Sequence, residues 1–256
     1  LMSEMVVLGR RAMGERPRAA RLADRRRVTL RGRPLWVEQL RLDAGAVTDG
    51  AAVLGGGSAF ATLAFCGAGR EMAVDAIRSL RGDGELREIT LSGGDPLVLP
   101  DEELAGILRA CDVLPQLRNV RIHSRAPVHD PPRVTGQLVG RMIAASPVPL
   151  WFVVHTSHPR ELSPGFYRAV GMLQGGGIPV LNQTVLLRGV NDDPATLAEL
   201  FGALYGAGVK PYYLHHPDRV AGTARFRVTI ERGLALHRAL RGRLPGPAIP
   251  EYVLDL

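Results

Sequence analysis

Residues 89–100, ITLSGGDPLVLP, begin with a short apolar run that ends in two glycines and an acid. The run has the length of a buried strand, and Gly93 and Gly94 leave backbone groups uncovered directly after it. Asp95 follows at a place where a carboxylate can cap the next turn. Taken alone, the stretch is equally consistent with a strand-to-helix turn capped by Asp95 and with a turn that binds a ligand.

Apolar runs of strand length recur along the chain, and segments with helical spacing lie between them. Two of these segments begin with a capping residue followed by proline, at Ser163 and Asp193, as helices often do. Continuous apolar strands that alternate with helices are typical of a parallel sheet covered on both faces. Six units are fewer than the eight of a closed barrel, and they are also consistent with an open sheet. The six runs are 59–65, 87–92, 119–124, 149–154, 178–187 and 209–214.

Length, hydrophobicity and charge limit the class of protein. The chain has 256 residues, of which 46% are hydrophobic, and this suits one large domain. No run approaches the roughly 18 apolar residues of a membrane helix, and no stretch near the start resembles a signal peptide. We therefore expect a cytoplasmic protein without a membrane partner.

The net charge of +7 is concentrated at the start of the chain, where ten arginines fall within residues 1–33. These arginines lack interleaved aromatic residues, which favours a solvated helical face over a nucleic-acid interface. We therefore expect residues 1–57 to form a helical, basic N-terminal extension, and residues 58–256 to form the core of the fold. Nucleic acid is not expected as a partner.

Polar side chains follow the ends of five of the expected strands. Because the carboxyl ends of parallel strands meet at one edge of a sheet, these clusters should converge on the same rim. Five convergent clusters indicate a binding site more than the separate capping of each strand. The clusters are Ser92–Asp95, His123–Arg125, His155–His158, Asn182–Thr184 and His215–Asp218.

From about Arg87 to Leu256, roughly two thirds of the chain, the sequence resembles the lysine 2,3-aminomutase family of radical S-adenosylmethionine (SAM) enzymes. The resemblance implies a partial (β/α)6 barrel, in agreement with the six units counted above. It also implies a small amino acid as substrate and leaves a homo-oligomer open. The resemblance rests on LSGGDPLVLPDEEL, VRIHSRAPV, HTSHPREL, GIPVLNQTVLLRGVNDDP, VKPYYLHHPDRVAGTARFR and AIPEYVLDL.

The resemblance implies that SAM binds at the rim, where the Gly-Gly-acid turn of this superfamily holds its methionyl end. Arg125 would bind the methionyl carboxylate, because a guanidinium fork matches a carboxylate. His155 is also consistent with a core histidine that bonds to the backbone. The residues implied in SAM binding are Ser92, Gly93, Gly94, Asp95, Ser124, Arg125, His155 and Gln183.

The resemblance also implies how the substrate is chosen. Asp218 and Asp255 match two aspartates that grip the distant ammonium group of lysine in the family. Two carboxylates that face one ammonium group select for a cationic side chain, so lysine or a related long diamine is favoured over an acidic amino acid. Otherwise, Asp218 is a cap before Gly222, and Asp255 is a surface residue. The implied reaction is a 1,2-amino migration through a 5′-deoxyadenosyl radical and a pyridoxal phosphate (PLP) aldimine.

The sequence departs from the family in two places. The family holds a 4Fe–4S cluster on three cysteines spaced C-x3-C-x2-C, whereas this sequence has only Cys66 and Cys111. The family lysine that carries PLP would follow Leu256, and Lys210, the only lysine, begins a strand. The sequence thus identifies neither a catalytic residue nor a metal ligand. It leaves two interpretations open: the missing segments belong to a fuller gene product, or the protein is a degenerate homologue that binds SAM or a lysine-like ligand without radical chemistry.

Overall fold

The structure is a computed structural model. It describes residues 2–7, 21–30, 33–43, 59–64, 70–82, 86–92, 94–217 and 223–254, and within these ranges it describes side chains from Ala73 onward.

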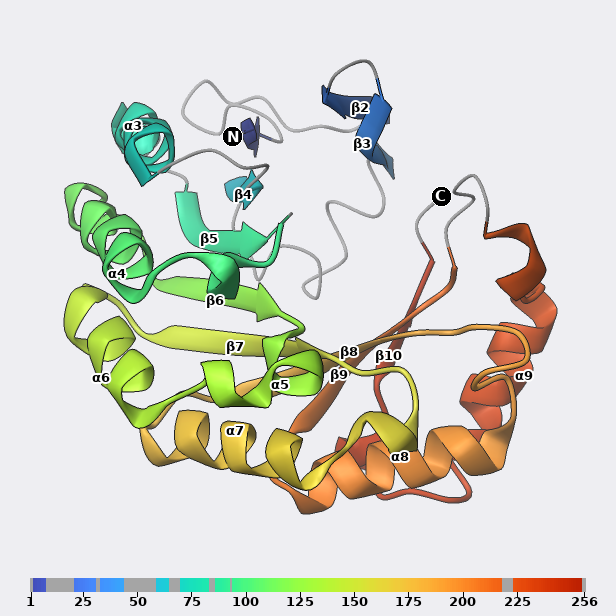
Figure 1. The fold of residues 1–256 in the computed structure, drawn as a ribbon. Helices are drawn as coiled ribbons and strands as arrows, with labels where there is room; N and C mark the ends of the chain where they lie inside the picture. The colour runs from blue at the N-terminus through green and yellow to red at the C-terminus, as the bar shows by residue number, and fades with distance from the viewer. Residues whose placement is uncertain are drawn as a thin grey trace.

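An eight-stranded sheet organises the described part of the chain, and it curves into a half-barrel (Figure 1). β1 pairs antiparallel with β4, and every later pair of neighbours in the sheet is parallel. In sheet order, the strands are β1 (Met2–Val7), β4 (Ala59–Ala64), β5 (Leu86–Ser92), β6 (Asn119–Ser124), β7 (Leu150–His155), β8 (Val180–Val185), β9 (Lys210–His215) and β10 (Glu251–Val253).

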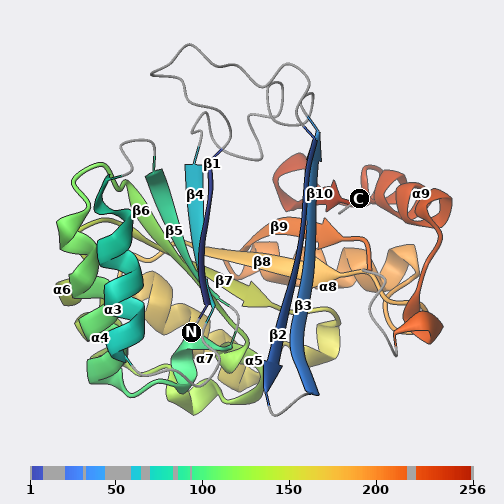
Figure 2. The ribbon, with the colours of Figure 1, turned by 90° about the horizontal axis from the view of Figure 1, so that it is seen from above.

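The helices cover the outer, convex face of this sheet, as Figures 1 and 2 show. Short 3₁₀ turns join several of them to the strands. None of the described helices lies on the inner, concave face (Figures 1 and 2). The helices are α3 (Arg70–Ser79), α4 (Asp101–Ala110), α5 (Ala126–His129), α6 (Gly136–Ala145), α7 (Pro164–Gly175), α8 (Pro194–Gly206) and α9 (Ile230–Leu240).

The partial barrel expected from the sequence is confirmed. The six expected strands correspond to β4–β9, and a seventh parallel strand, the short β10, lies beyond β9 at the end of the sheet. Both expected helix starts are also present. The Ser163 hydroxyl accepts a hydrogen bond from the Phe166 amide at 3.1 Å, and the Asp193 carboxylate accepts from the amides of Ala195 and Thr196. These bonds to Asp193, the one from Thr196 foremost, lower the pKa of its carboxyl group.

The helical extension expected for residues 1–57 is wrong for the residues of this segment that the structure describes. They form β1 and an antiparallel pair, β2 (Arg21–Leu30) and β3 (Arg33–Asp43). The register places Val28 opposite Trp36, and β-branched and aromatic residues favour strands. The helical expectation rested on the charge of the arginines. The residues on either side of Arg31 and Gly32 nevertheless have the composition of a hairpin.

Strand alternation decides which side chains reach the concave face. In β6, Val120, Ile122 and Ser124 are buried, whereas the alternate residues Arg121 and His123 are only half-buried. Because successive side chains point to opposite faces, the buried set packs beneath the helices and the other set faces the concave side. The largest side chains in the packed layer include Phe152, Phe166, Phe201, Ile89 and Leu91.

None of the helices in the described ranges combines the length and the apolar character that crossing a membrane requires.

Candidate functional site

Asp95 joins the loop after β5 to the end of β6. One carboxylate oxygen accepts a hydrogen bond from the Leu97 amide at 3.0 Å and caps the 3₁₀ turn Pro96–Val98. The other oxygen accepts from the Arg125 amide at 2.8 Å. The capping role considered for Asp95 is therefore confirmed, and the same carboxylate also fixes the backbone from which the Arg125 side chain extends. Gly94 is half-buried beside it, and Gly93 lies outside the described residues.

Arg125 extends from this point toward the loop after β7. Its side chain is 53% exposed, and its guanidinium group pairs with the Glu161 carboxylate at 3.3 Å. The second oxygen of Glu161 accepts from the amides of Ser157 and His158 at 2.5 and 3.2 Å. Glu161 thus links the loops after β6 and β7. Our sequence interpretation missed it, although His158 and Glu161 have the spacing of a capping box, which the structure contains.

His155 and His123 meet on the concave face. Nε2 of His155 lies 3.4 Å from Nδ1 of His123, and the rings contact edge to face with centroids 5.5 Å apart. Burial is the main cause that lowers the pKa of His123 to about 2 and the pKa of His155 to about 4. The positive charges of Arg121 and Arg125 add to this effect on His123 and His155, respectively. Both rings are therefore neutral near pH 7. The partner of His155 is thus a side chain, not the backbone considered from the sequence.

The other expected site residues divide between the two faces of the sheet. The register pairs His155 with Gln183, so the half-buried Gln183 lies beside it on β8. Ser92 is half-buried at the end of β5. Ser124, in contrast, is 3% exposed, and its hydroxyl accepts from the Ala126 amide at the start of α5. The structure therefore gathers Asp95, Arg125, His155 and Gln183 at one rim and turns the Ser124 side chain toward the helices. Asp218 and Asp255 lie outside the described residues.

A buried amide network supports the rim from behind. The Asn182 side chain accepts from the backbone and hydroxyl of Thr156 and donates to the Thr184 hydroxyl at 2.8 Å. Asn191 donates to the carbonyls of Ser157 and Val185 and accepts from the amide of Leu187. These bonds explain physically why NQTVLLRGVND is distinctive: its two asparagines hold the loops after β7 and β8.

A polar layer lies below the histidines, nearer the start of the strands. Arg121 pairs with Glu88, and its guanidinium group donates to the Tyr212 hydroxyl at 3.3 Å. The Tyr212 hydroxyl in turn donates to Tyr213 at 2.7 Å. Since β7 and β8 separate β6 from β9, the Arg121–Tyr212 contact spans the concave face. This layer forms a floor under the rim.

The described residues do not fit an iron–sulfur cluster. Cys111 is buried in the turn after α4, its thiol lies 3.7 Å from the Ile107 carbonyl, and burial raises its pKa to about 12. Cys66 lies outside the described residues. In the described ranges, no group of three or more His, Cys, Asp or Glu side chains could hold a metal ion. The whole sequence has two cysteines, fewer than the three thiolates that the cluster needs.

Lys210 does not fit the role of a PLP lysine. It begins β9, at the opposite end of the strand from the rim, and its ammonium group donates to the Pro247 carbonyl. Desolvation lowers its pKa, and the nearby Glu251 opposes this shift. A lysine that carries a cofactor must be directed at the reacting group, and Lys210 is held at the far end of the barrel.

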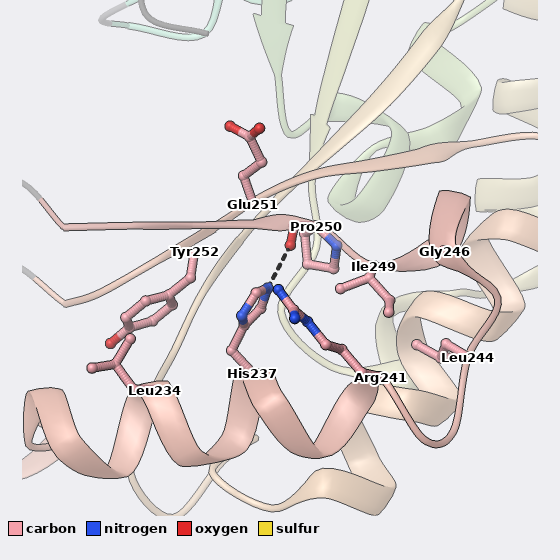
Figure 3. Close-up of a pocket in the computed structure, with 9 residues that line it drawn as sticks. All are labelled: Leu234, His237, Arg241, Leu244, Gly246, Ile249, Pro250, Glu251 and Tyr252. Carbon is pink, nitrogen blue, oxygen red and sulfur yellow. Dashed lines mark hydrogen bonds between the residues drawn. The ribbon is translucent and has the colours of Figure 1, made fainter. Parts of the chain in front are cut away.

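A separate pocket of about 750 Å³ lies between α9 and β10 (Figure 3). None of the site residues expected from the sequence lines it. The His237 ring donates to the Pro250 carbonyl at 2.8 Å and stacks on Tyr252. Tyr252 passes so close to Gly233 that a Cβ atom there would collide with its hydroxyl. The pocket therefore belongs to the packing of α9 against the edge of the sheet.

The chain is similar to several curated L-lysine 2,3-aminomutases. It is 42% identical over 173 residues to a putative L-lysine 2,3-aminomutase of Aquifex aeolicus, a match that covers 67% of this chain and 46% of that protein. It is 39% identical over 180 residues to the enzyme of Methanococcus maripaludis (70% and 41%) and over 181 residues to that of Escherichia coli (71% and 53%). The chain thus spans about half the length of the curated relatives it matches.

Solved structures share the fold at low sequence identity. Streptococcus suis SuiB bound to S-adenosylmethionine matches with a TM-score of 0.53 at 11% identity, over 75% of this chain and 44% of that one. A radical SAM methyltransferase from Sphaerobacter thermophilus matches with a TM-score of 0.50 at 17% identity, over 91% and 77%. Both likenesses concern the fold alone.

A family model described as "UreD urease accessory protein" matches residues 1–125, slightly less than half of the chain. The 125 residues of this match and the 173 residues of the Aquifex aeolicus match add up to more than the 256 residues of the chain, so the two matches overlap. The aminomutase similarity is the longer of the two and agrees with the half-barrel. About 70% of the chain is thus similar to part of the L-lysine 2,3-aminomutases of these organisms.

Proposed function

We propose that this chain forms the SAM-binding half-barrel of a lysine 2,3-aminomutase-type enzyme, an isomerase that moves an amino group between neighbouring carbons of lysine or a related cationic amino acid. The observation that carries the proposal is the identity of about 40% to L-lysine 2,3-aminomutases over about 70% of the chain. The half-barrel and its polar rim support it.

The residues of the rim suit the chemical groups of SAM. The exposed guanidinium group of Arg125 is available to the methionyl carboxylate, because only one of its nitrogens is paired with Glu161. The neutral rings of His123 and His155 do not repel the positive sulfonium and ammonium groups. Gln183 adds a donor and an acceptor beside them. Nε2 of His123 is a buried polar atom without a hydrogen-bond partner in the described residues, as expected for a site that a ligand completes.

Asp218 and Asp255 are proposed to bind the distant ammonium group of the substrate. In the family, an iron–sulfur cluster supplies an electron to SAM, and PLP stabilises the migrating group. The residues of this chain fit neither, so we derive no step through them. The proposed role of the chain is to bind SAM and a cationic amino acid, with Arg125 and the histidines placed around SAM.

Calorimetry with SAM tests the proposal. Wild-type protein should bind SAM, and Arg125→Gln should weaken binding about ten- to a hundredfold, because a hydrogen-bonded charge pair contributes roughly 1.5–3 kcal/mol and 1.4 kcal/mol is a factor of ten. Arg160→Gln is a matched control, since Arg160 is an exposed arginine on the neighbouring loop. If wild-type protein shows no SAM binding, or both variants bind alike, the proposed SAM site is wrong. Intact mass together with iron and sulfide content separates a longer, cluster-bearing enzyme from the degenerate homologue that binds without radical chemistry.

A second candidate function concerns the N-terminal part of the chain alone. The UreD family model covers β1, β2 and β3, which lie before the stretches that resemble the aminomutases. A urease accessory role predicts that the full-length tagged chain copurifies with urease from cells that make both, and that residues 1–57 are needed for this. Absence of urease from the purified complex would contradict the role.

A further inference from the structure

His123 is a residue of β6 that takes part in the proposed SAM site only as a neutral neighbour of His155. His123 faces the concave side, because Ile122 and Ser124 on either side of it are buried beneath the helices. Its Nδ1 lies 3.4 Å from Nε2 of His155 on the adjacent strand. Nδ1 of His123 thus contacts another residue of the chain, and Nε2 is the ring nitrogen still to be accounted for.

That other nitrogen, Nε2, is buried and has no hydrogen-bond partner in the part of the chain that the structure describes. Buried polar atoms in folded proteins are almost always paired, because an unpaired one forgoes its bonds to water without replacement. The floor does not satisfy it, since Arg121 directs its bonds to Glu88, Thr90 and Tyr212. The atom therefore marks a position where a ligand group completes the structure.

The contact between the two rings decides what His123 can offer. A neutral imidazole has one donor nitrogen and one acceptor nitrogen. If His155 donates to Nδ1 of His123, then Nε2 of His123 carries the hydrogen and is a donor. If His123 donates instead, its Nε2 is an acceptor. The pair can therefore match either hydrogen-bonding sense by moving two hydrogens between ring nitrogens, without a change of charge.

The charges around His123 select an uncharged partner. The groups that act on this pair of rings are Arg121, Arg125, Asp95, His155 and His215, and the two arginines favour the neutral ring. The positive charges of Arg121 and Arg125 disfavour a cationic ligand group beside these rings. Arg125 at the rim suits the carboxylate, which leaves the uncharged hydroxyls and base edges of SAM for His123. A hydroxyl group can both donate and accept, as Nε2 of this pair can.

From this the geometry points to a further binding residue: His123 Nε2 hydrogen-bonds an uncharged group, a ribose hydroxyl or a base edge, of the nucleoside part of bound SAM. The inference rests on the proposed SAM site and extends it to the part of the ligand that Arg125 does not reach.

Three substitutions of His123 separate binding from packing. Asn places a polar atom near Nδ1 and keeps the contact with His155, but it has nothing at Nε2. Gln places a polar atom near Nε2, and Phe fills the volume without nitrogens. His123→Asn and His123→Phe should each weaken the binding of SAM and S-adenosylhomocysteine about five- to tenfold, the range of one hydrogen bond. His123→Gln should restore most of the affinity, and methionine binding should not change in any of them.

His129→Asn is the matched control, because His129 is exposed at the end of α5. A wild-type protein that does not bind SAM would overturn the proposed function and this inference together. A wild-type protein that binds SAM as tightly as His123→Asn does would overturn this inference alone and leave the SAM site in place.

Nitrogen NMR of histidine-labelled wild-type protein provides a second measurement, which does not depend on the variants folding. The Nε2 resonance of His123 should shift on addition of S-adenosylhomocysteine and saturate with the calorimetric affinity. A resonance that stays unchanged at saturating ligand would refute the contact.

Discussion

Replacement of Asp95 should lower the stability of the fold, whether or not a ligand is bound. Its carboxylate accepts two backbone hydrogen bonds, from Leu97 at 3.0 Å and from Arg125 at 2.8 Å. A capping bond contributes about 1 kcal/mol, and a bond from an amide to a charged acceptor about 1.5–3 kcal/mol. Asp95→Ala should therefore lower the free energy of unfolding by about 2.5–4 kcal/mol. Asp95→Asn keeps one acceptor oxygen and should lose about half of that.

Chemical denaturation and thermal melting measure this loss. For a domain of this size, 1 kcal/mol corresponds to roughly 2–4 °C in Tm, so Asp95→Ala should melt about 5–15 °C lower. Asp112→Asn is the control, because Asp112 is exposed in the turn after α4. A change below about 0.5 kcal/mol in Asp95→Ala, the size common for surface substitutions, would refute the argument that Asp95 ties β5 to β6.

Three further predictions follow from the site. Because His123 and His155 have lowered pKa values, about 2 and about 4, the unfolded chain binds protons that the folded chain does not; stability should fall by about 1.4 kcal/mol per histidine per pH unit from pH 6.5 toward pH 4.5. Urea unfolding at several pH values measures this slope, and His155→Gln should flatten it. Asn182→Ala removes a fully buried amide and leaves its partners unpaired, so denaturant unfolding should show a loss of about 2–4 kcal/mol; an unchanged midpoint would contradict the network. Asp218→Asn and Asp255→Asn should each weaken lysine binding by roughly two to three orders of magnitude in calorimetry while SAM affinity stays constant, and better protection of the protein by glutamate than by lysine would disprove a cation-selecting pocket.

The sequence predicted the central strands because each is a separate apolar run between residues that cap or break helices. Ser163 and Asp193 were identifiable as helix caps because such caps act through neighbouring backbone amides. β1 was missed because its partner, β4, lies about 50 residues away in the sequence. β2 and β3 pair locally, and they were missed because the many arginines of β2 were interpreted as a solvated helical face, although the segment also holds β-branched and aromatic residues that favour strands.

The sequence predicted where the rim lies more accurately than it predicted which side chains face it. Which residue of a strand faces inward depends on its parity, and a shift of one residue changes the face. His123 and Ser124 are the last two residues of β6, and the resemblance implied Ser124 as the ligand-binding one. Val120 and Ile122 are apolar and alternate with His123, so they share the face of Ser124. This pattern indicates that His123 is the residue that faces the concave side. Glu161 was missed for another reason, since its bond to Arg125 joins two loops that are far apart in sequence.

The contact between Arg121 and Tyr212 has a mechanical consequence. In a closed barrel, the number of strands and their stagger fix the radius, but among the described strands this sheet does not close, so its curvature has no such constraint. Arg121 and Tyr212 connect β6 directly to β9, as a chord connects two points on an arc, and the length of a chord limits how far the arc can flatten. The guanidinium group of Arg121 and the phenol of Tyr212 thus oppose flattening of the sheet between β6 and β9 from the floor, away from the residues of the rim.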